Sequence, residues 1–254
     1  MPIASGIYYS LYEGTDQQKT PLVFIHGAGG NHLYWPAAIR HLPGQRVFCI
    51  DLPGHGKSEG SSQQSVWGYA QRIVNFITEL GIYQAIFVGH SLGGCLALAL
   101  SLEHSDQVAG LGLVATASHI ELPEAIMAQV SHTGSFPLVV AALKELAFSP
   151  HTDAGLINDA MQNLAKTRPS LLYNDLIAGM NFDIHNRLEG IKVPALILTG
   201  SDDQITPPAC ARAMAVNLPQ ANLHIIPNAG HMVQLEQPAA VTAALLQFLN
   251  QFSE

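Results

Sequence analysis

A serine lies between two glycines in the segment 89–93, which reads GHSLG and has the spacing G-x-S-x-G. A short apolar run precedes this segment and a run of helix-forming residues follows it, so Ser91 is expected on a sharp turn between a strand and a helix. Such a turn strains the backbone, and glycines two residues to either side let the strand and the helix approach each other. Ser91 is therefore the predicted nucleophile.

Two later turns carry the groups that a serine nucleophile needs. A serine hydroxyl reacts poorly near neutral pH unless a base lies within hydrogen-bond reach. The turn after the predicted strand 195–199 contains Asp202 and Asp203, and the loop after the last predicted strand contains His231. Because the carboxyl ends of parallel strands share one edge of a sheet, these side chains can converge with Ser91. The sequence predicts acyl transfer by a Ser-His-Asp group.

The elements that must position these residues follow an alternating pattern. Short runs rich in Val, Ile, Leu and Phe recur between segments of helical period, which is typical of a parallel sheet covered on both faces. The predicted strands are residues 6–12, 22–25, 47–50, 85–88, 108–114, 195–199 and 223–226. The predicted helices between them are residues 35–41, 69–80, 94–104, 209–218 and 238–252.

The alternation stops between residues 118 and 190, where no strand-like run occurs. The segments 123–130, 137–147, 152–166 and 170–178 instead read as helices separated by Pro, Gly and Ser. The predicted fold class is therefore α/β, a mostly parallel, doubly wound sheet with a helical cap inserted between two strands. Residues 1–117 and 191–254 are expected to form the core, and residues 118–190 the cap.

The order Ser, then acid, then His along the chain resembles that of the α/β-hydrolase superfamily. Three further segments resemble the family's loops, and with the motif they extend the resemblance over essentially the whole chain: LVFIHGAGG at 22–30, DLPGHGKS at 51–58 and NAGH at 228–231. The resemblance implies His231 as general base. It favours Asp203 over Asp202 as the acid, because the family's turn resembles Asp-x-x-x-Pro and Pro207 stands at the matching position.

The oxyanion of the reaction is expected to bind two backbone N–H groups. That of Leu92 lies at the start of the predicted helix behind the nucleophile, whose positive end favours negative charge. That of Ala28 is implied by the resemblance. No cofactor is needed for this chemistry.

The cap is expected to line the substrate pocket with Phe136, Phe148 and Phe182, which favours a small, largely apolar substrate. Ester, thioester and lactone hydrolysis are left open. One alternative is a carbon-carbon bond hydrolase; such relatives typically carry an Arg before the acid pair and a Gly-Pro in the oxyanion loop, where this chain has Ser201 and Gly29-Gly30. Another is a hydrolase-fold binding protein with little turnover.

Composition limits the partners. The formal net charge is −8 with only 11 Lys and Arg, which argues against binding to nucleic acid. No apolar run approaches the roughly 18 residues of a membrane span, and no leader segment is recognisable. Three widely spaced cysteines without a C-x-x-C pair indicate a reducing cytoplasm, and neither they nor the histidines predict a metal site. The sequence leaves the oligomeric state open, and a small molecule is the expected partner.

Three histidines near the predicted site are interpreted as structural. His26 and His55 lie in glycine-rich loops, where histidines commonly hydrogen-bond to neighbouring backbone. His90 stands beside the nucleophile. Cys95 follows one helical turn after Ser91 and is expected to be buried and inert.

Overall fold

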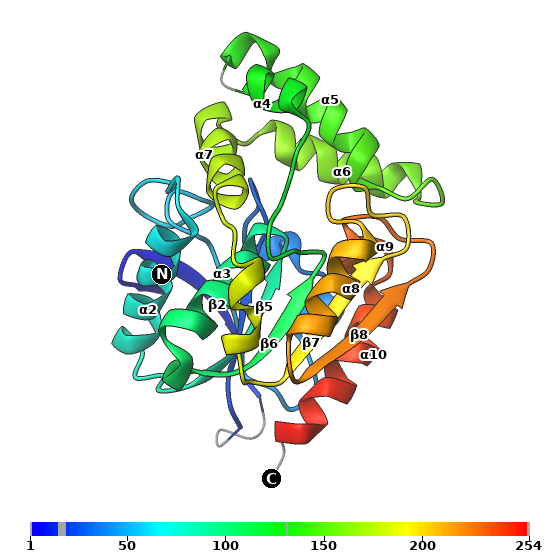
Figure 1. Cartoon of the computed structure of the whole chain (residues 1–254). Coiled ribbons are helices and arrows are strands. Elements are labelled where there is room, and N and C mark those ends of the chain that lie inside the picture. Colours follow the sequence, from blue (N-terminus) through cyan, green and yellow to red (C-terminus); the bar gives the residue numbers. More distant parts are fainter. Residues whose placement is uncertain (1, 15–18, 131, 253–254) are drawn as a thin grey trace.

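The structure, a computed structural model, describes residues 2–14, 19–130 and 132–252 (Figure 1). Its strands are β1 (Ile3–Ala4), β2 (Ile7–Tyr12), β3 (Leu22–Ile25), β4 (Val47–Ile50), β5 (Ala85–His90), β6 (Val108–Val114), β7 (Ala195–Gly200) and β8 (Ala221–Ile226). Its helices are α1 (Ala37–Arg40), α2 (Val66–Glu79), α3 (Leu92–Glu103), α4 (Glu124–Val130), α5 (Phe136–Ala147), α6 (Ala154–Ala165), α7 (Pro169–Met180), α8 (Pro208–Asn217), α9 (Val233–Glu236) and α10 (Pro238–Leu249).

The strands form one sheet in the order β1-β2-β4-β3-β5-β6-β7-β8. Strands β1 and β2 pair antiparallel at one edge, and every pair from β4 to β8 is parallel. The chain passes from β3 outward to β4 and returns to β5, so the direction of winding switches beside β3. Ile25 pairs with Gly89 across β3 and β5. The loop after β3 and the turn after β5 therefore leave the sheet side by side, at the place where ligands bind in such folds.

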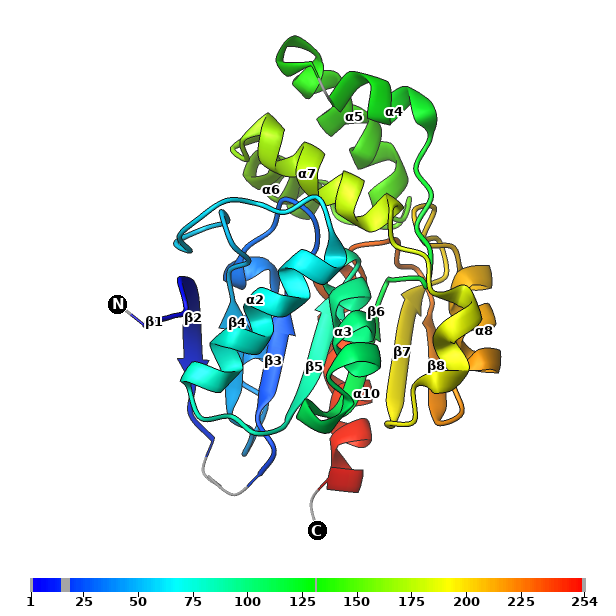
Figure 2. The same cartoon turned by 60° about the vertical axis from the view of Figure 1, so that its left-hand side comes forward.

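Helices cover both faces of the sheet (Figure 2). One face packs against α2, α3 and α8, and the other against α1 and α10. Helix α2 is amphipathic, whereas α3 is buried on every side from Leu92 to Ser101. An all-apolar helix of this kind is stable only inside the protein, because each of its faces must be removed from water. It fixes the residue just before it, Ser91, in the middle of the molecule.

The predicted fold class is confirmed, and the differences lie mainly at element ends. Strand β8 begins at Ala221, two residues before the predicted start, and most of its side chains are only half-buried because it lies at the sheet edge. Helix α2 begins at Val66 rather than at residue 69. The two-residue strand β1 and the four-residue helix α9 were not predicted, since neither is long enough to carry a periodic pattern.

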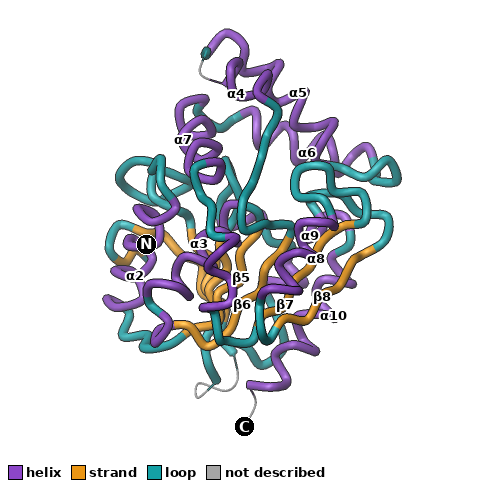
Figure 3. Tube along the Cα trace, in the orientation of Figure 1, coloured by secondary structure: helices purple, strands orange, loops and turns teal. Residues whose placement is uncertain are grey.

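Helices α4 to α7 lie between β6 and β7 in the chain and above the carboxyl ends of the parallel strands. Figure 3 shows this upper region as helix and loop, with the strands gathered below it. The first and last residues of this region pair with each other: the Ile184 N–H donates to the Ser118 carbonyl at 3.0 Å, and His119 and Asp183 form a β-bridge. The 3-10 helix at His185–Gly190 contacts α8, and its Leu188 is buried in the main core. We therefore propose residues 118–183 as the cap, rather than 118–190.

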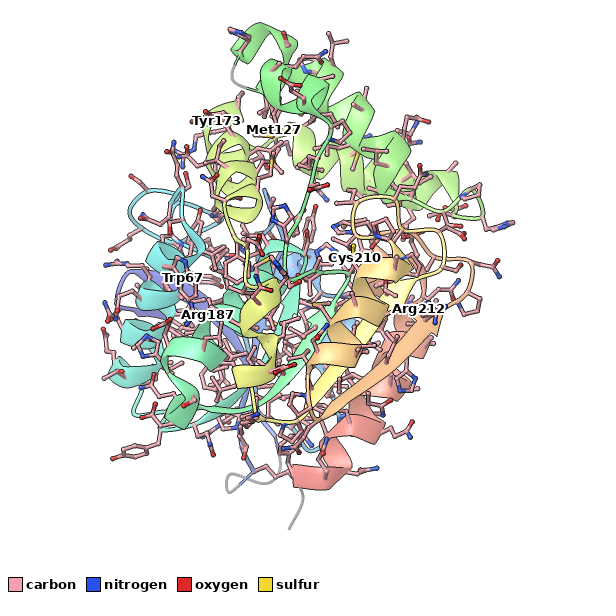
Figure 4. The ribbon with its side chains drawn as sticks, viewed as in Figure 1. Trp67, Met127, Tyr173, Arg187, Cys210 and Arg212 are labelled. Carbon is pink, nitrogen blue, oxygen red and sulfur yellow. The ribbon has the colours of Figure 1, made fainter. Side chains whose placement is uncertain are left out.

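The cap has a small apolar core of its own. Helix α4 contacts α5 and α7, and α5 contacts α6. Met127 of α4 and Tyr173 of α7 pack at the edge of this core (Figure 4). Below the cap, Arg187 lies over the ring of Trp67 at 5.5 Å, also labelled in Figure 4. Within the described ranges, no helix combines the length and hydropathy needed to cross a membrane.

Candidate active site

Ser91 occupies a strained turn at the end of β5. Its φ of 52° and ψ of −117° lie in a backbone region that residues other than glycine rarely adopt. The turn is held from β6 and the loop after it, because the Ser91 N–H donates to the Val114 carbonyl at 2.9 Å and the Thr116 hydroxyl donates to the Ser91 carbonyl at 2.8 Å. A Cβ at Gly89 would lie 2.0 Å from the Gly93 carbonyl oxygen. This close approach requires the first glycine of G-x-S-x-G, and the second is required because a Cβ at Gly93 would lie 2.3 Å from the Ile25 carbonyl oxygen.

His231 and Asp203 are paired. The His231 Nδ1 lies 3.0 Å from Oδ2 and 3.1 Å from Oδ1 of Asp203. The same carboxylate accepts hydrogen bonds from the N–H groups of Ile205 and Thr206, each at 2.9 Å, and from the Thr206 hydroxyl at 2.8 Å. Burial acts to raise the pKa of Asp203, but His231 and these donors outweigh it and the pKa is lowered. The ionised carboxylate assigns the proton of His231 to Nδ1 and leaves Nε2 as an acceptor.

The neighbouring carboxylate of Asp202 points elsewhere. Its oxygens accept hydrogen bonds from the hydroxyls of Ser149, at 2.6 Å, and Ser201, at 2.8 Å. Ser149 belongs to the loop after α5, so Asp202 ties the core to the cap. The structure thus brings Asp203, and not Asp202, to His231.

The loop that carries His231 rests on the end of α5. The His231 N–H donates to the Ala147 carbonyl at 2.8 Å, and a Cβ at Gly230 would lie 2.7 Å from the same oxygen. From the other side, Nε2 of His90 lies 2.9 Å from the His231 carbonyl and donates to it. Burial, with the nearby His231, lowers the pKa of His90 to about 3, so this ring is neutral. His90 therefore has the geometry of a structural group.

The loop after β3 presents a backbone N–H. The Gly27 carbonyl accepts hydrogen bonds from Nδ1 of His26 at 2.8 Å and from the Gly30 N–H at 3.1 Å. In a trans peptide the N–H points opposite to the carbonyl, so these bonds fix the direction of the Ala28 N–H. Within the described part of the chain, the N–H groups of Ala28 and Leu92 have no acceptor. Two donors are thus available beside Ser91.

His26 links this loop to the loop after β4. Its Nε2 accepts a hydrogen bond from the Leu52 N–H at 3.0 Å while Nδ1 donates to Gly27. Burial first, and then the neighbouring His55, lower the pKa of His26 to about 4. Both ring nitrogens are occupied by backbone, which matches the structural interpretation of this histidine.

A cavity beneath the cap contains the predicted nucleophile and base. Ser91, Leu92, His231 and Ala28 all line it. The other polar side chains on its wall are Tyr34, His90 and Asp175. Most of the remaining wall is apolar and comes largely from the cap: Ile120, Leu122, Leu143, Ala147, Met161, Leu164, Leu172, Leu176, Ile205 and Met232. Such a wall suits an apolar acyl or alcohol group.

The three phenylalanines predicted to bind substrate do not line this cavity. Phe136 is buried in the small core of the cap, and Phe148 packs against Met232 where the cap meets the core. Phe182 is buried with the main core, and its ring centroid lies 5.6 Å from that of Trp67. The prediction was wrong because a large apolar residue at helical spacing is as suited to filling the cap's interior as to facing a ligand.

The sequence reasoning missed Asp175 on α7. This carboxylate is 1% exposed and contacts the loop after β3, the loop after β4 and helix α2. No motif signals it, because its partners are distant in sequence. Within the described residues no cluster of His, Cys, Asp or Glu has the arrangement of a metal site. Cys95 is buried, and burial raises the pKa of its thiol to about 12, so it is not a competing nucleophile.

Comparisons with known proteins identify the family of the chain. A family model described as the alpha/beta hydrolase family matches residues 22–245. A relative from Caulobacter sp. (strain K31), named as a candidate carbamate hydrolase (RutD), is 29% identical over 96% of each chain. The 2-hydroxymuconate semialdehyde hydrolase of Pseudomonas sp. (strain CF600) is 28% identical over 97% of this chain and 92% of its own.

The fold is also that of solved structures. A thermophilic esterase from Thermogutta terrifontis superposes with a TM-score of 0.87 over 98% of this chain and 94% of its own, at 24% identity. At that identity the likeness concerns the fold alone. The family model, in contrast, covers most of the sequence, including the segments that carry Ser91, Asp203 and His231. The chain belongs to the alpha/beta hydrolase family.

Proposed function

We propose that this protein is a serine hydrolase that cleaves an ester, thioester or lactone bond in a small, largely apolar substrate. The observation that carries the proposal is the pairing of His231 with the buried Asp203 in the same cavity as Ser91. Ser91 stands on a strained turn directly before the N-terminus of α3. This is the set of groups that acyl transfer requires, namely nucleophile, oriented base and donors for an oxyanion.

The steps follow from the positions of these groups. Nε2 of His231 accepts the hydroxyl proton as the Ser91 oxygen attacks the substrate carbonyl carbon, and Asp203 stabilises the imidazolium. The N–H groups of Ala28 and Leu92 hold the oxyanion of the tetrahedral intermediate. His231 then gives the proton to the leaving oxygen or sulfur, which departs and leaves an acyl-enzyme. Water, deprotonated by His231, releases the acid and restores Ser91.

Hydrolysis of a carbon-carbon bond is the second candidate. The relative named 2-hydroxymuconate semialdehyde hydrolase favours it, and the same nucleophile and base could serve. Against it, Ser201 stands before the acid pair and Gly29-Gly30 in the loop after β3, where that class typically has Arg and Gly-Pro. Among the described residues, the lining of the mostly apolar cavity also includes no Lys or Arg for a charged dienoate.

A labelling and turnover experiment tests the proposal. A fluorophosphonate should modify Ser91, as located by mass spectrometry, and Ser91→Ala should lower turnover of a phenyl ester by about 10³–10⁶-fold, since triad members act as a unit. The Ser101→Ala variant, which removes a buried serine of the same helix region, is the matched control. More than a tenth of the activity in Ser91→Ala, or label at another residue, would contradict the mechanism.

A substrate panel decides between the bonds. Esters, thioesters, lactones and vinylogous diketones are compared by kcat/KM on one sample. Faster cleavage of the diketones than of every acyl substrate would favour the carbon-carbon alternative. The absence of turnover with all four classes would favour a binding protein.

A further inference from the structure

Three segments of the core meet one carboxylate of the cap. Asp175 of α7 accepts hydrogen bonds from the Gly29 N–H at 2.8 Å, from Nε2 of His55 at 2.7 Å and from the Tyr69 hydroxyl at 2.6 Å. Gly29 directly follows Ala28 in the loop that presents the oxyanion donor. Tyr69 belongs to α2 and His55 to the loop after β4. Asp175 is therefore the point where the cap is fixed to the oxyanion loop.

The ring of His55 pairs with this carboxylate. Its Nε2 faces Asp175, and its Nδ1 lies 3.1 Å from the Pro53 carbonyl. Both partners can accept a hydrogen bond, so the imidazolium form, in which both ring nitrogens donate, satisfies both contacts. Burial acts to lower the pKa of His55, but the attraction and hydrogen bond of Asp175 outweigh it and the pKa is raised. The pairing thus favours the charged form of His55 beside Asp175.

The cap holds Gly29 at both of its peptides, Ala28–Gly29 and Gly29–Gly30. Besides the Asp175 contact with the N–H, the Thr167 hydroxyl donates to the Gly29 carbonyl at 3.0 Å. Gly29 has a φ of +66°, and a Cβ there would lie 2.9 Å from Leu164 and 3.3 Å from Leu172, both of the cap. The backbone of Gly29 is therefore packed against the cap with no room for a side chain. Rotation of the Ala28–Gly29 peptide would change the backbone angles of the preceding residue, Ala28.

We propose that Asp175, assisted by Thr167, is a positioning residue: it holds the Gly29 peptide so that the Ala28 N–H stays aimed at the oxyanion. This inference rests on the proposed serine-hydrolase function. In this arrangement the cap both encloses the substrate and completes the catalytic geometry. Leu172, Asp175, Leu176 and Gly179 all line the cavity from α7. Because residues three and four apart share a helix face, substrate contact and the hold on Gly29 lie on one face.

Two matched pairs of variants test the proposal. Asp175→Asn leaves one acceptor oxygen instead of two for the three donors Gly29, His55 and Tyr69, and Asp159→Asn makes the same change at an exposed site of α6. Thr167→Val removes the hydroxyl while keeping the shape, and Thr167→Ser keeps the hydroxyl. The measurements are kcat and KM for a phenyl ester, Ki for a trifluoromethyl ketone that forms a tetrahedral oxyanion on Ser91, and hydrogen exchange of peptides containing Gly29.

The expected result is a loss in the oxyanion state only. Asp175→Asn should lower kcat by about 10–100-fold, below the roughly 10²–10³-fold cost of removing an oxyanion donor outright, with KM changed less than about threefold. The ketone Ki should rise by the same factor as kcat/KM falls, and exchange near Gly29 should quicken. Thr167→Val should lower kcat by about 3–10-fold, while the kcat values of Thr167→Ser and Asp159→Asn should stay within about twofold of that of the parent enzyme.

Three outcomes overturn the proposal. One is turnover of Asp175→Asn within about twofold of the parent enzyme. Another is a loss of turnover with an unchanged ketone Ki, which would mean a structural role. If Asp175→Asn fails to fold, equal kcat in Thr167→Val and Thr167→Ser decides against it. Failure of a fluorophosphonate to label Ser91 in the unaltered protein would overturn the proposed function as well, whereas normal labelling with unaffected variants overturns this inference alone.

Discussion

Asp202 and Asp203 are adjacent in sequence but have different surroundings. Asp203 is buried and faces His231, and its oxygens accept from two backbone N–H groups and from Thr206. Asp202 is partly exposed and accepts hydrogen bonds from two serine hydroxyls. Consecutive residues in an extended or turning chain point in different directions, so only one of the pair can serve the histidine.

The first prediction separates these two residues. Asp203→Asn should lower kcat by about 10³–10⁴-fold, because an amide at this position favours the wrong tautomer of His231. Asp202→Asn should change kcat less than about threefold, since its carboxylate contacts Ser149 and Ser201 rather than His231. Phenyl-ester turnover of the two purified variants measures the ranking. A larger loss in Asp202→Asn would assign the acid to the other residue.

Residues of the site differ in how far sequence can predict them. Ser91 is marked by the local motif G-x-S-x-G, in which Gly89 is required by the nearby backbone of Gly93 and Gly94. Asp175 is not, because its partners Gly29, His55 and Tyr69 are 146, 120 and 106 residues away. A lone acid within a helical pattern reads as a solvated side chain until the fold brings those donors to it.

At the scale of elements, the parallel sheet was predictable because each buried strand is a short apolar run and each covering helix has its own period. The interior of the cap was less predictable from the sequence. Its helices are apolar on the sides facing one another and also on the side facing the cavity, so periodicity does not separate the two. Leu143 lines the cavity, whereas Phe136 of the same helix fills the cap's core.

The second prediction uses that pair. Leu143→Ala should enlarge the cavity and move the preferred acyl chain of phenyl esters toward greater length, because each added methylene in an apolar pocket is worth about 1–3 kcal/mol. Phe136→Ala should leave the chain-length profile unchanged and lower the free energy of unfolding by about 3–5 kcal/mol, as core truncations of this size do. Kinetics over a chain-length series, with thermal unfolding of both variants, tests this. A shift of the chain-length profile in Phe136→Ala, but not in Leu143→Ala, would mean that the acyl pocket lies beside Phe136 rather than Leu143.

For the whole molecule, the cap joins the core on both sides of Ser91. On one side Asp175 and Thr167 hold Gly29. On the other, the loop after α5 meets the histidine loop, where the Glu236 carboxylate accepts from the N–H groups of Ser149 and Gly230 at 2.9 and 3.0 Å. The catalytic groups thus depend on contacts between two parts of the chain that fold around separate apolar cores. A change at this boundary should alter stability and activity together.

The last prediction concerns the pH dependence of that boundary. The pKa of His55 is raised in the folded protein, so its ionisation stabilises the fold fully below the unfolded pKa of about 6.5 and ceases to do so as pH rises through the folded value. His55→Gln should therefore lower the unfolding temperature most near pH 6, since breaking a buried ion pair costs about 3–5 kcal/mol, and progressively less toward pH 9.

The groups facing this ring are Asp175, His26, Asp51 and Tyr69. His26 is neutral over this range because burial holds its pKa near 4, and Tyr69, whose pKa is raised by burial, also stays neutral. Scanning calorimetry of both proteins between these pH values measures the difference, and a gap that widens with pH would show that His55 is neutral in the fold.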